Sequence, residues 1–201
     1  MPLRSQANVQ SQGAVLMLSL VQKKALLQIA RRAIAARWLE EPASDADLTD
    51  LRALSHHFSG VFVSLHAGKK LRGCIGSLTN IAPLPELVAE MAAAAASHDP
   101  RFAPLRPDEL DEVDIEISLL YPMKPLRSPD EIVIGRDGLM VRLGKKHGLL
   151  LPQVAPQRGW NALAFLQCVC RKADLPPEAW QNPEAEVLCF RAEVFSDRSL
   201  A

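Results

Sequence analysis

The stretch GVFVSLHAGKKLRGCIG, residues 60–76, decides the fold of this chain. Residues 60–66 are rich in β-branched and aromatic side chains, Gly68-Lys69 is typical of a turn, and residues 71–75 fit a return strand, so we expect a β-hairpin. One register puts the aliphatic side chains on a single face: Leu65 opposite Leu71, Val63 opposite Gly73 and Val61 opposite Ile75. The other face then carries Phe62, Ser64 and His66 opposite Cys74, Arg72 and Lys70.

The return strand carries a cysteine framed by two glycines. Glycine weakens a strand, so Gly73 and Gly76 mark a bulge or a place where another group approaches the backbone closely. In an extended strand Arg72 and Cys74 point to the same face, and a nearby positive charge lowers the pKa of a thiol and activates it as a nucleophile. Cys74 is therefore a candidate nucleophile. The alternative is that Cys74 is a small buried apolar residue, because free cysteine is among the most buried residue types.

Composition sets the limits of the functional classes. The chain has 201 residues, of which 48% are apolar and 23% charged, as expected for one soluble globular domain. Its formal net charge is zero, which gives no indication of binding to nucleic acid or to an anionic membrane. No apolar run has the length of a membrane span. The four cysteines include no Cys-x-x-Cys pair, so we expect a reducing cytoplasm, although residues 14–21 faintly resemble a secretory leader.

The remaining chain alternates helices and strands. Ser19 is a candidate N-cap for a helix that reaches Trp38. Further helices are expected over residues 83–98 and 161–174, and strands over 113–119, 138–143, 148–151 and 187–195. This order predicts an α+β fold with a mainly antiparallel sheet.

Other candidate sites are weaker. His66 shares the predicted face of Cys74 and is a candidate base, but no histidine has a diagnostic spacing to the cysteine. On a helix, Cys168 and Cys170 point roughly 200° apart, so they do not predict a metal site. Cys170 has the position of a core residue on that helix. No phosphate loop, dinucleotide fingerprint or serine elbow is present, and we expect neither a metal nor a cofactor.

The chain also resembles the AMMECR domain family. The most specific landmark is LRGCIGSL at residues 71–78, and the others follow in order: GVFVSL at 60–65, DPRFAPL at 99–105, EISLL at 116–120, GLLLPQV at 148–154, GW at 159–160 and CRKADLP at 170–176. The resemblance covers about residues 15–196. Two positions depart from the family pattern, because Asp174 stands where a glycine is common and His98 where an arginine or another residue is expected. Neither position touches the signature.

The resemblance implies an organisation as well as a fold. It implies an antiparallel sheet flanked by helices, with a smaller second subdomain and a groove between the two near the signature. We expect residues 1–14 to form a disordered N-terminal tail, 15–196 a single AMMECR-type domain of two subdomains, and 197–201 a C-terminal tail.

The resemblance also implies partners but no reaction. In bacteria and archaea such proteins are called protein A of the AmmeMemoRadiSam system, whose other members are a Memo-type protein and a radical-SAM enzyme. We expect a component that handles a ligand or substrate, with Cys74 as its catalytic residue and a small anionic group as ligand. The expected binding residues are Arg72, Gly73, Gly76, Arg101 and Gln153.

Each of these functional interpretations has an alternative. The alternative to a ligand-handling component is a non-enzymatic interaction module that uses the signature hairpin as a docking surface. Arg101 is then a brace for the turn after the alanine-rich helix, and Gln153 satisfies backbone groups after Pro152. Glu116 is expected on a solvated strand face.

Overall fold

The computed structural model describes residues 17–39, 48–79 and 81–200, so the predicted tail at residues 1–14 lies outside the described residues. One antiparallel sheet runs through the molecule in the strand order β2-β1-β3-β7-β5-β6, and β4 pairs with β7 beside this path. The strands are β1 (Gly60–Ala67), β2 (Lys70–Ser77), β3 (Val113–Leu120), β4 (Lys124–Pro125), β5 (Asp137–Leu143), β6 (Lys146–Leu150) and β7 (Glu186–Ser196). The helices are α1 (Leu20–Ala35), α2 (Thr49–Ala53), α3 (Leu84–Ser97), α4 (Val154–Gln157) and α5 (Ala162–Lys172).

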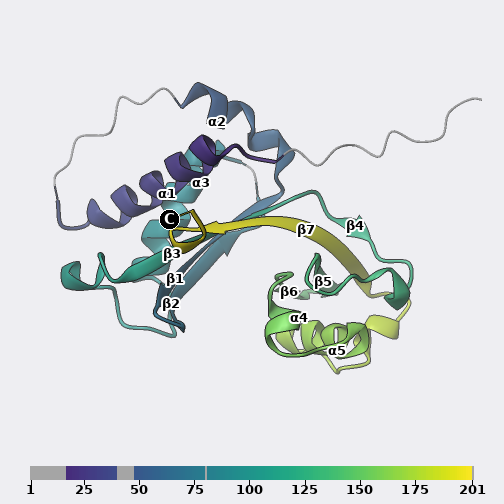
Figure 1. Cartoon of the computed structure of the whole chain (residues 1–201). Coiled ribbons are helices and arrows are strands. Elements are labelled where there is room, and N and C mark those ends of the chain that lie inside the picture. Colours follow the sequence, from purple (N-terminus) through teal and green to yellow (C-terminus); the bar gives the residue numbers. More distant parts are fainter. Residues whose placement is uncertain (1–16, 40–47, 80, 201) are drawn as a thin grey trace, which may run out of the picture.

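The long strand β7 belongs to two lobes. Its residues 192–196 pair with β3, whereas residues 186–191 pair with β5. Figure 1 shows β7 as the curved strand that runs from the lobe with α1, α2 and α3 to the lobe with α4 and α5. The predicted α+β class with a mainly antiparallel sheet is therefore confirmed. After β7 the chain forms a short turn, Arg198–Leu200.

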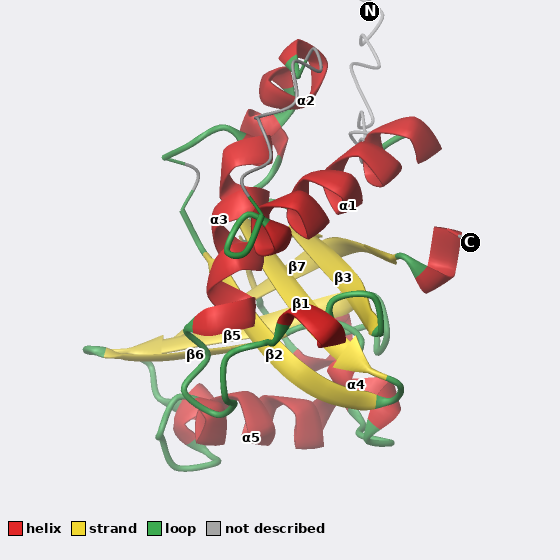
Figure 2. Ribbon diagram, turned by 90° about the vertical axis from the view of Figure 1, so that its left-hand side faces the viewer, coloured by secondary structure: helices red, strands yellow, loops and turns green. Residues whose placement is uncertain are grey.

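The first lobe buries one face of the sheet under α1 and α3 (Figure 2). The alternating pattern of β3 places Ile115 and Ile117 in this core with no exposed surface, as expected. Ser19 caps α1 and forms a capping box with Gln22, which confirms the predicted helix start. The alanine-rich helix α3 packs closely on the strands because its small side chains keep its backbone near the sheet.

The second lobe has a separate core between α5 and strands β5 and β6. Phe165, Val169 and Cys170 are fully buried there, so the predicted core position of Cys170 is confirmed. The sequence pattern of the helix over residues 161–174 also places Leu163 on the apolar face with Leu166 and Cys170, but Leu163 is 49% exposed. At about 100° per residue, Leu163 lies at the edge of the buried stripe and in the first turn of the helix, where less of the sheet covers it.

The predicted register of the first hairpin is wrong by two residues. Val63 lies opposite Ile75 and Leu65 opposite Gly73, and the register shifts between Leu65 and His66, which lies opposite Leu71. The turn uses only two residues, and a bulge at Arg72 absorbs one more. For the pairs on the far side of the bulge from the turn, the shift of two residues keeps the side chains on their predicted faces, so Ser64 and Cys74 still share one. On the turn side, the bulge places Leu71 opposite His66 instead. Leu71, next to the bulge, is 37% exposed instead of apolar core.

A buried carboxylate fixes the start of α1 to β7. Glu193 is 4% exposed, and its carboxylate lies 2.8 Å from Lys23 Nζ. The backbone N–H of Leu18 donates to both carboxylate oxygens at 3.2 Å, and the Tyr121 hydroxyl donates at 3.0 Å. Burial, and then the hydrogen bond to Glu193, raise the pKa of Tyr121 well above its usual value. These contacts hold together three segments that are distant in sequence.

We expect the Glu193→Ala variant to lose about 3 kcal/mol in free energy of unfolding, because it leaves a largely buried ammonium and a buried N–H without partners. The measurement is urea denaturation followed by circular dichroism. Glu186→Ala is the matched control, since Glu186 pairs with Arg142 but is 53% exposed at its side chain. That control should lose less than about 1 kcal/mol. Equal losses in the two variants would contradict the assignment of Glu193 as an anchor.

Candidate functional site

The sheet face turned away from α1 and α3 carries a row of polar side chains. Cys74 lies opposite Ser64, Ser64 opposite Glu116, and Glu116 opposite Ser196, so four adjacent strands each contribute one polar residue. Directly opposite residues of an antiparallel ladder have their Cβ atoms about 4.5–5.5 Å apart. The Ser64 hydroxyl donates to Cys74 Sγ at 3.2 Å. We call Cys74, Ser64, Glu116 and Ser196 the polar row.

Gln153 reaches the polar row from the second lobe. It lies immediately before α4, and its Nε2 donates to Glu116 Oε1 at 3.2 Å and contacts Ser118 Oγ at 3.5 Å. Ser118 is 1% exposed on the same face of β3. The sequence predicted Glu116 on a solvated strand face. In the structure Glu116 is half-buried and accepts a hydrogen bond. The structure brings Gln153 and the Cys74 strand to one face of the sheet.

His66 lies two residues after Ser64 on β1, so its side chain is on the same face of the sheet. It is opposite Asp114 of β3, and its Nε2 atom is buried without a hydrogen-bond partner among the described residues. Asp114 accepts a hydrogen bond from the backbone N–H of Arg198 at 2.9 Å. A role for His66 as a base for Cys74 stays a prediction.

Asp99 and Arg101 hold the backbone of Cys74. Strand β2 is at the edge of the sheet, and the N–H of Cys74 donates to Asp99 Oδ2 at 2.8 Å, while its carbonyl accepts from Arg101 Nη2 at 3.3 Å. Arg101 also donates to both oxygens of Asp99, at 2.9 and 2.6 Å. The two side chains therefore replace the missing neighbouring strand at Cys74. These contacts are those expected if Arg101 braces the turn after α3. A ligand-binding role for Arg101 stays a prediction.

The same pair has shifted pKa values. The hydrogen bond from Arg101 holds the pKa of Asp99 far below its usual value, although burial opposes this shift. The Asp99 carboxylate in turn raises the pKa of Arg101. The Asp99 side chain is 2% exposed and that of Arg101 is 53% exposed, so an ion pair with one buried partner lies directly beside the backbone of the candidate nucleophile.

Arg72 is engaged by the loop that follows α3. Its Nε and Nη2 bind the two oxygens of Glu109 at 2.9 and 3.0 Å, and its other donors reach the carbonyls of Ala103 at 2.7 Å and Pro104 at 3.2 Å. The hydrogen bond from Arg72 also lowers the pKa of Glu109. Binding of an anion by Arg72 stays a prediction, and it requires Arg72 to leave Glu109.

The two signature glycines sit where the chain approaches itself. A Cβ on Gly73 would lie 2.2 Å from the carbonyl oxygen of Ala95 in α3, and a Cβ on Gly76 would lie 2.2 Å from the ring of Phe62. Both contacts are closer than any side chain tolerates. The space beside each glycine is thus filled by the chain itself, and a ligand-binding role for either glycine stays a prediction.

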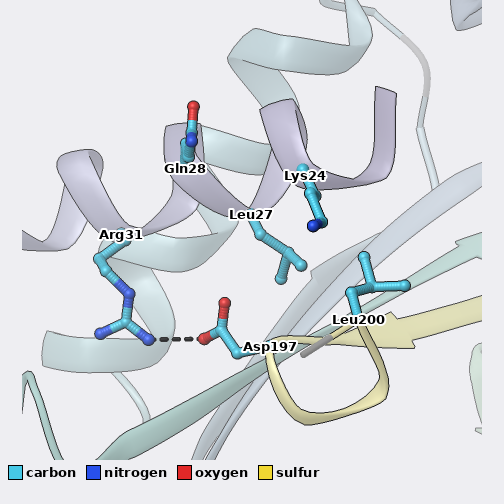
Figure 3. A pocket seen from close by; sticks show the side chains of 6 residues that line it. All are labelled: Lys24, Leu27, Gln28, Arg31, Asp197 and Leu200. Carbon is cyan, nitrogen blue, oxygen red and sulfur yellow. Dashed lines mark hydrogen bonds and ion pairs between the residues drawn. The ribbon is translucent and has the colours of Figure 1, made fainter. Parts of the chain in front are cut away.

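A separate pocket lies between α1 and the C-terminal turn, on the other side of the sheet (Figure 3). Arg31 in its wall pairs with Asp197 and donates to the carbonyls of Leu110 at 2.6 Å and Val113 at 3.1 Å. The Arg31 guanidinium is engaged in these contacts, which attach the C-terminal turn to α1 and β3. We therefore interpret this pocket as a structural contact rather than a ligand site. Within the described ranges, no group of three or more His, Cys, Asp or Glu side chains is placed to hold a metal ion. The helices in the same ranges include none that is long and apolar enough to cross a membrane.

These features define a class of α+β protein in which one strand is shared by two lobes and an edge strand presents a cysteine to a polar face. A family model described as AMMECR1 matches residues 27–195, and the chain belongs to this family. The predicted family resemblance is therefore confirmed.

The relatives include several archaeal proteins. Protein MK0488 of Methanopyrus kandleri is 41% identical over 194 residues, which cover 90% of this chain and 90% of that protein. Protein TK0174 of Thermococcus kodakarensis is 40% identical, with coverage of 86% of this chain and 88% of that protein. The crystal structure of the uncharacterized protein PH0010 from Pyrococcus horikoshii superposes with a TM-score of 0.79 at 37% identity and covers 88% of this chain and 91% of that chain.

Sequence reasoning missed several residues around Cys74. It placed Ser64 on the correct face of the hairpin but gave it no role, and the alternation of β1 was the signal that could have found it. The contacts of Asp99 and Glu109 carried no signal, because their partners Cys74 and Arg72 are more than 20 positions away, on the other side of helix α3.

We expect Gly73→Ala to lose about 2 kcal/mol of stability, because a backbone carbonyl of α3 has to move to admit the methyl group. Urea denaturation measures this loss. Lys70→Ala, at the exposed start of β2, is the control and should change stability by less than about 0.5 kcal/mol. A neutral Gly73→Ala substitution would show that α3 and β2 are not in close contact.

The Asp99 carboxylate makes a specific contribution to acid sensitivity. Its pKa is lowered in the folded state, so its stabilising effect is present above the unfolded value of about 3.9 and is lost as the pH falls below it. In urea denaturation at a series of pH values, the wild type should lose stability more steeply below about pH 4 than Asp99→Asn. Asp111→Asn, which removes a charge from the exposed surface, should follow the wild type. Parallel curves for wild type and Asp99→Asn would contradict this assignment.

Proposed function

We propose that this AMMECR1-family chain handles a small-molecule substrate at the polar row, with Cys74 as its nucleophile or covalent carrier. The observation that carries the proposal is the hydrogen bond from the Ser64 hydroxyl to Cys74 Sγ at 3.2 Å, in a row that Gln153 completes from the other lobe. Cys74 is half-buried, so its sulfur is neither packed into a core nor freely solvated. A fixed orientation and partial exposure let a substrate approach the sulfur in a defined geometry.

The chemistry is that of thiol addition to an electrophilic carbon. With an acyl substrate, the sulfur forms a bond to the carbonyl carbon, the bond to the leaving group breaks, and the leaving group takes the proton that the thiol gives up. The product is a thioester on Cys74. Ser64 orients the sulfur, and the clamp of Asp99 and Arg101 fixes the backbone that carries it.

We further propose that the chain acts together with a Memo-type protein and a radical-SAM enzyme. This part of the proposal rests on the family resemblance alone, and the polar row is the surface at which a substrate would be passed on. The competing function is a docking module, and one observation favours it: Arg72, Gly73 and Gly76 all have structural partners within the chain.

The first test is the reactivity of the four thiols in the native protein. Iodoacetamide is added and alkylation at each cysteine is followed by peptide mass spectrometry. Cys74 should react at least about tenfold faster than Cys170, which is fully buried. Protection of Cys74 equal to that of Cys170 would mean a packed thiol and would remove the nucleophile.

The second test uses the chain with its proposed partners. Wild type, Cys74→Ser and the control Cys168→Ser are incubated with a Memo-type protein, a radical-SAM enzyme and a small-molecule extract of the source cells, and intact masses are recorded. An adduct on the wild type and on Cys168→Ser, absent from Cys74→Ser, supports the carrier role. Full partner binding and full cellular function of Cys74→Ala, without any adduct on the wild type, would favour the docking module.

A further inference from the structure

Next to the polar row lies a buried hydrogen-bond acceptor that has no donor in the described part of the chain. Gln153 Oε1 is buried and has no hydrogen-bond partner among the described residues. The orientation of this amide is fixed by chemistry, because turning it over would place Oε1 against Glu116 Oε1 and set two acceptors against each other. Nε2 must therefore face Glu116, and Oε1 must face away from it.

The carboxylate beside it also has unused capacity. Glu116 takes part in no ion pair within the described part of the chain, and its only hydrogen bond there is the one from Gln153 to Oε1. An ionised carboxylate accepts about four hydrogen bonds. Because it is half-buried, water satisfies this capacity less completely than on an open surface.

The positive charges nearby are already neutralised. Arg72 is bound to Glu109 through two contacts, and Arg101 is bound to both oxygens of Asp99. Among the charged groups that the structure places around Cys74, Glu116 is the one whose charge is uncompensated. The site therefore presents acceptors and a net negative charge.

An unsatisfied buried acceptor costs about 1–3 kcal/mol, and native proteins contain few of them. A ligand that donates hydrogen bonds would recover this cost, whereas an anion would add repulsion from Glu116. Gln153 and Glu116 are in direct contact, so Gln153 Oε1 and Glu116 Oε2 lie close to each other. One group with several N–H donors can therefore bind both oxygens.

We infer that the site at Cys74 recognises a cationic nitrogen group on its ligand, such as an amine, amidine or guanidine, through Gln153 Oε1 and the Glu116 carboxylate. This inference rests on the proposed function of the polar row, and it replaces the anionic ligand expected from Arg72. The cationic group binds at Glu116, two strands away from the thiol, and the electrophilic carbon of the ligand lies between this group and Cys74 Sγ.

The test compares two thiol reagents of the same size and opposite charge. These are the trimethylammonium-ethyl and the sulfonato-ethyl methanethiosulfonates, each of which forms a disulfide with the thiol and releases methanesulfinate. Their rates at Cys74 are measured by mass spectrometry in a Cys168→Ser, Cys189→Ser background and divided by the rates with 2-mercaptoethanol. The cationic reagent should react about tenfold faster than the anionic one after this correction.

Glu116→Gln should bring the corrected ratio of the two rates close to one, since it keeps an acceptor for Gln153 but removes the charge. Glu112→Gln, an exposed carboxylate four residues away, is the matched control and should leave the ratio unchanged. Circular dichroism and urea denaturation show that each variant is folded.

The outcomes separate this inference from the proposed function. Equal corrected rates in the wild type, or a faster anionic reagent, would overturn the cationic ligand but leave a reactive Cys74. A faster anionic reagent would also restore the anion site at Arg72. Failure of both reagents at Cys74 would overturn the nucleophile and the ligand class together.

Discussion

The pairing of β7 with two different partners is the constraint on which the rest of this structure depends. Strand β7 pairs with β3 along residues 192–196 and with β5 along residues 186–191. A single sheet therefore runs through both lobes and contributes to both hydrophobic cores. Each core is covered by its own helices, α1 and α3 in one lobe and α5 in the other. Because the strand is continuous, Gln153 of the second lobe comes to lie against β3 of the first.

The second constraint is the edge position of β2. An edge strand leaves backbone groups unpaired and needs protection. Here the protection comes from Asp99 and Arg101 at Cys74, and from the Arg72 contacts with the loop that follows. The residues that make the signature look like a binding site are therefore also the residues that close the sheet. This arrangement fixes the position of the Cys74 thiol, because the backbone of Cys74 is held by Asp99 and Arg101 while its side chain contacts Ser64 on the polar face.

Much of the fold was accessible from the sequence because it follows from local periodicity. The alternation of residues 113–119 and the cap at Ser19 predicted a strand and a helix that the structure confirms. The faces of the first hairpin were correct, but its register was not, because a bulge at Arg72 leaves no periodic trace. The convergence of Cys74 and Gln153 was harder still. It depends on β7, which begins more than 100 residues after the end of the hairpin and whose pairing with two strands is a property of the whole sheet.

The continuous strand β7 also limits how the two lobes can move. Strand β7 has no break that could serve as a hinge, and its partner changes from β5 to β3 near Arg191 and Ala192, so a rotation of one lobe against the other twists β7 at this point. Such a torsion carries Gln153 with the second lobe while Glu116 stays with the first. The length of the hydrogen bond between Gln153 and Glu116 therefore changes with lobe rotation. This bond lies one strand away from Ser64 and two strands away from the thiol of Cys74.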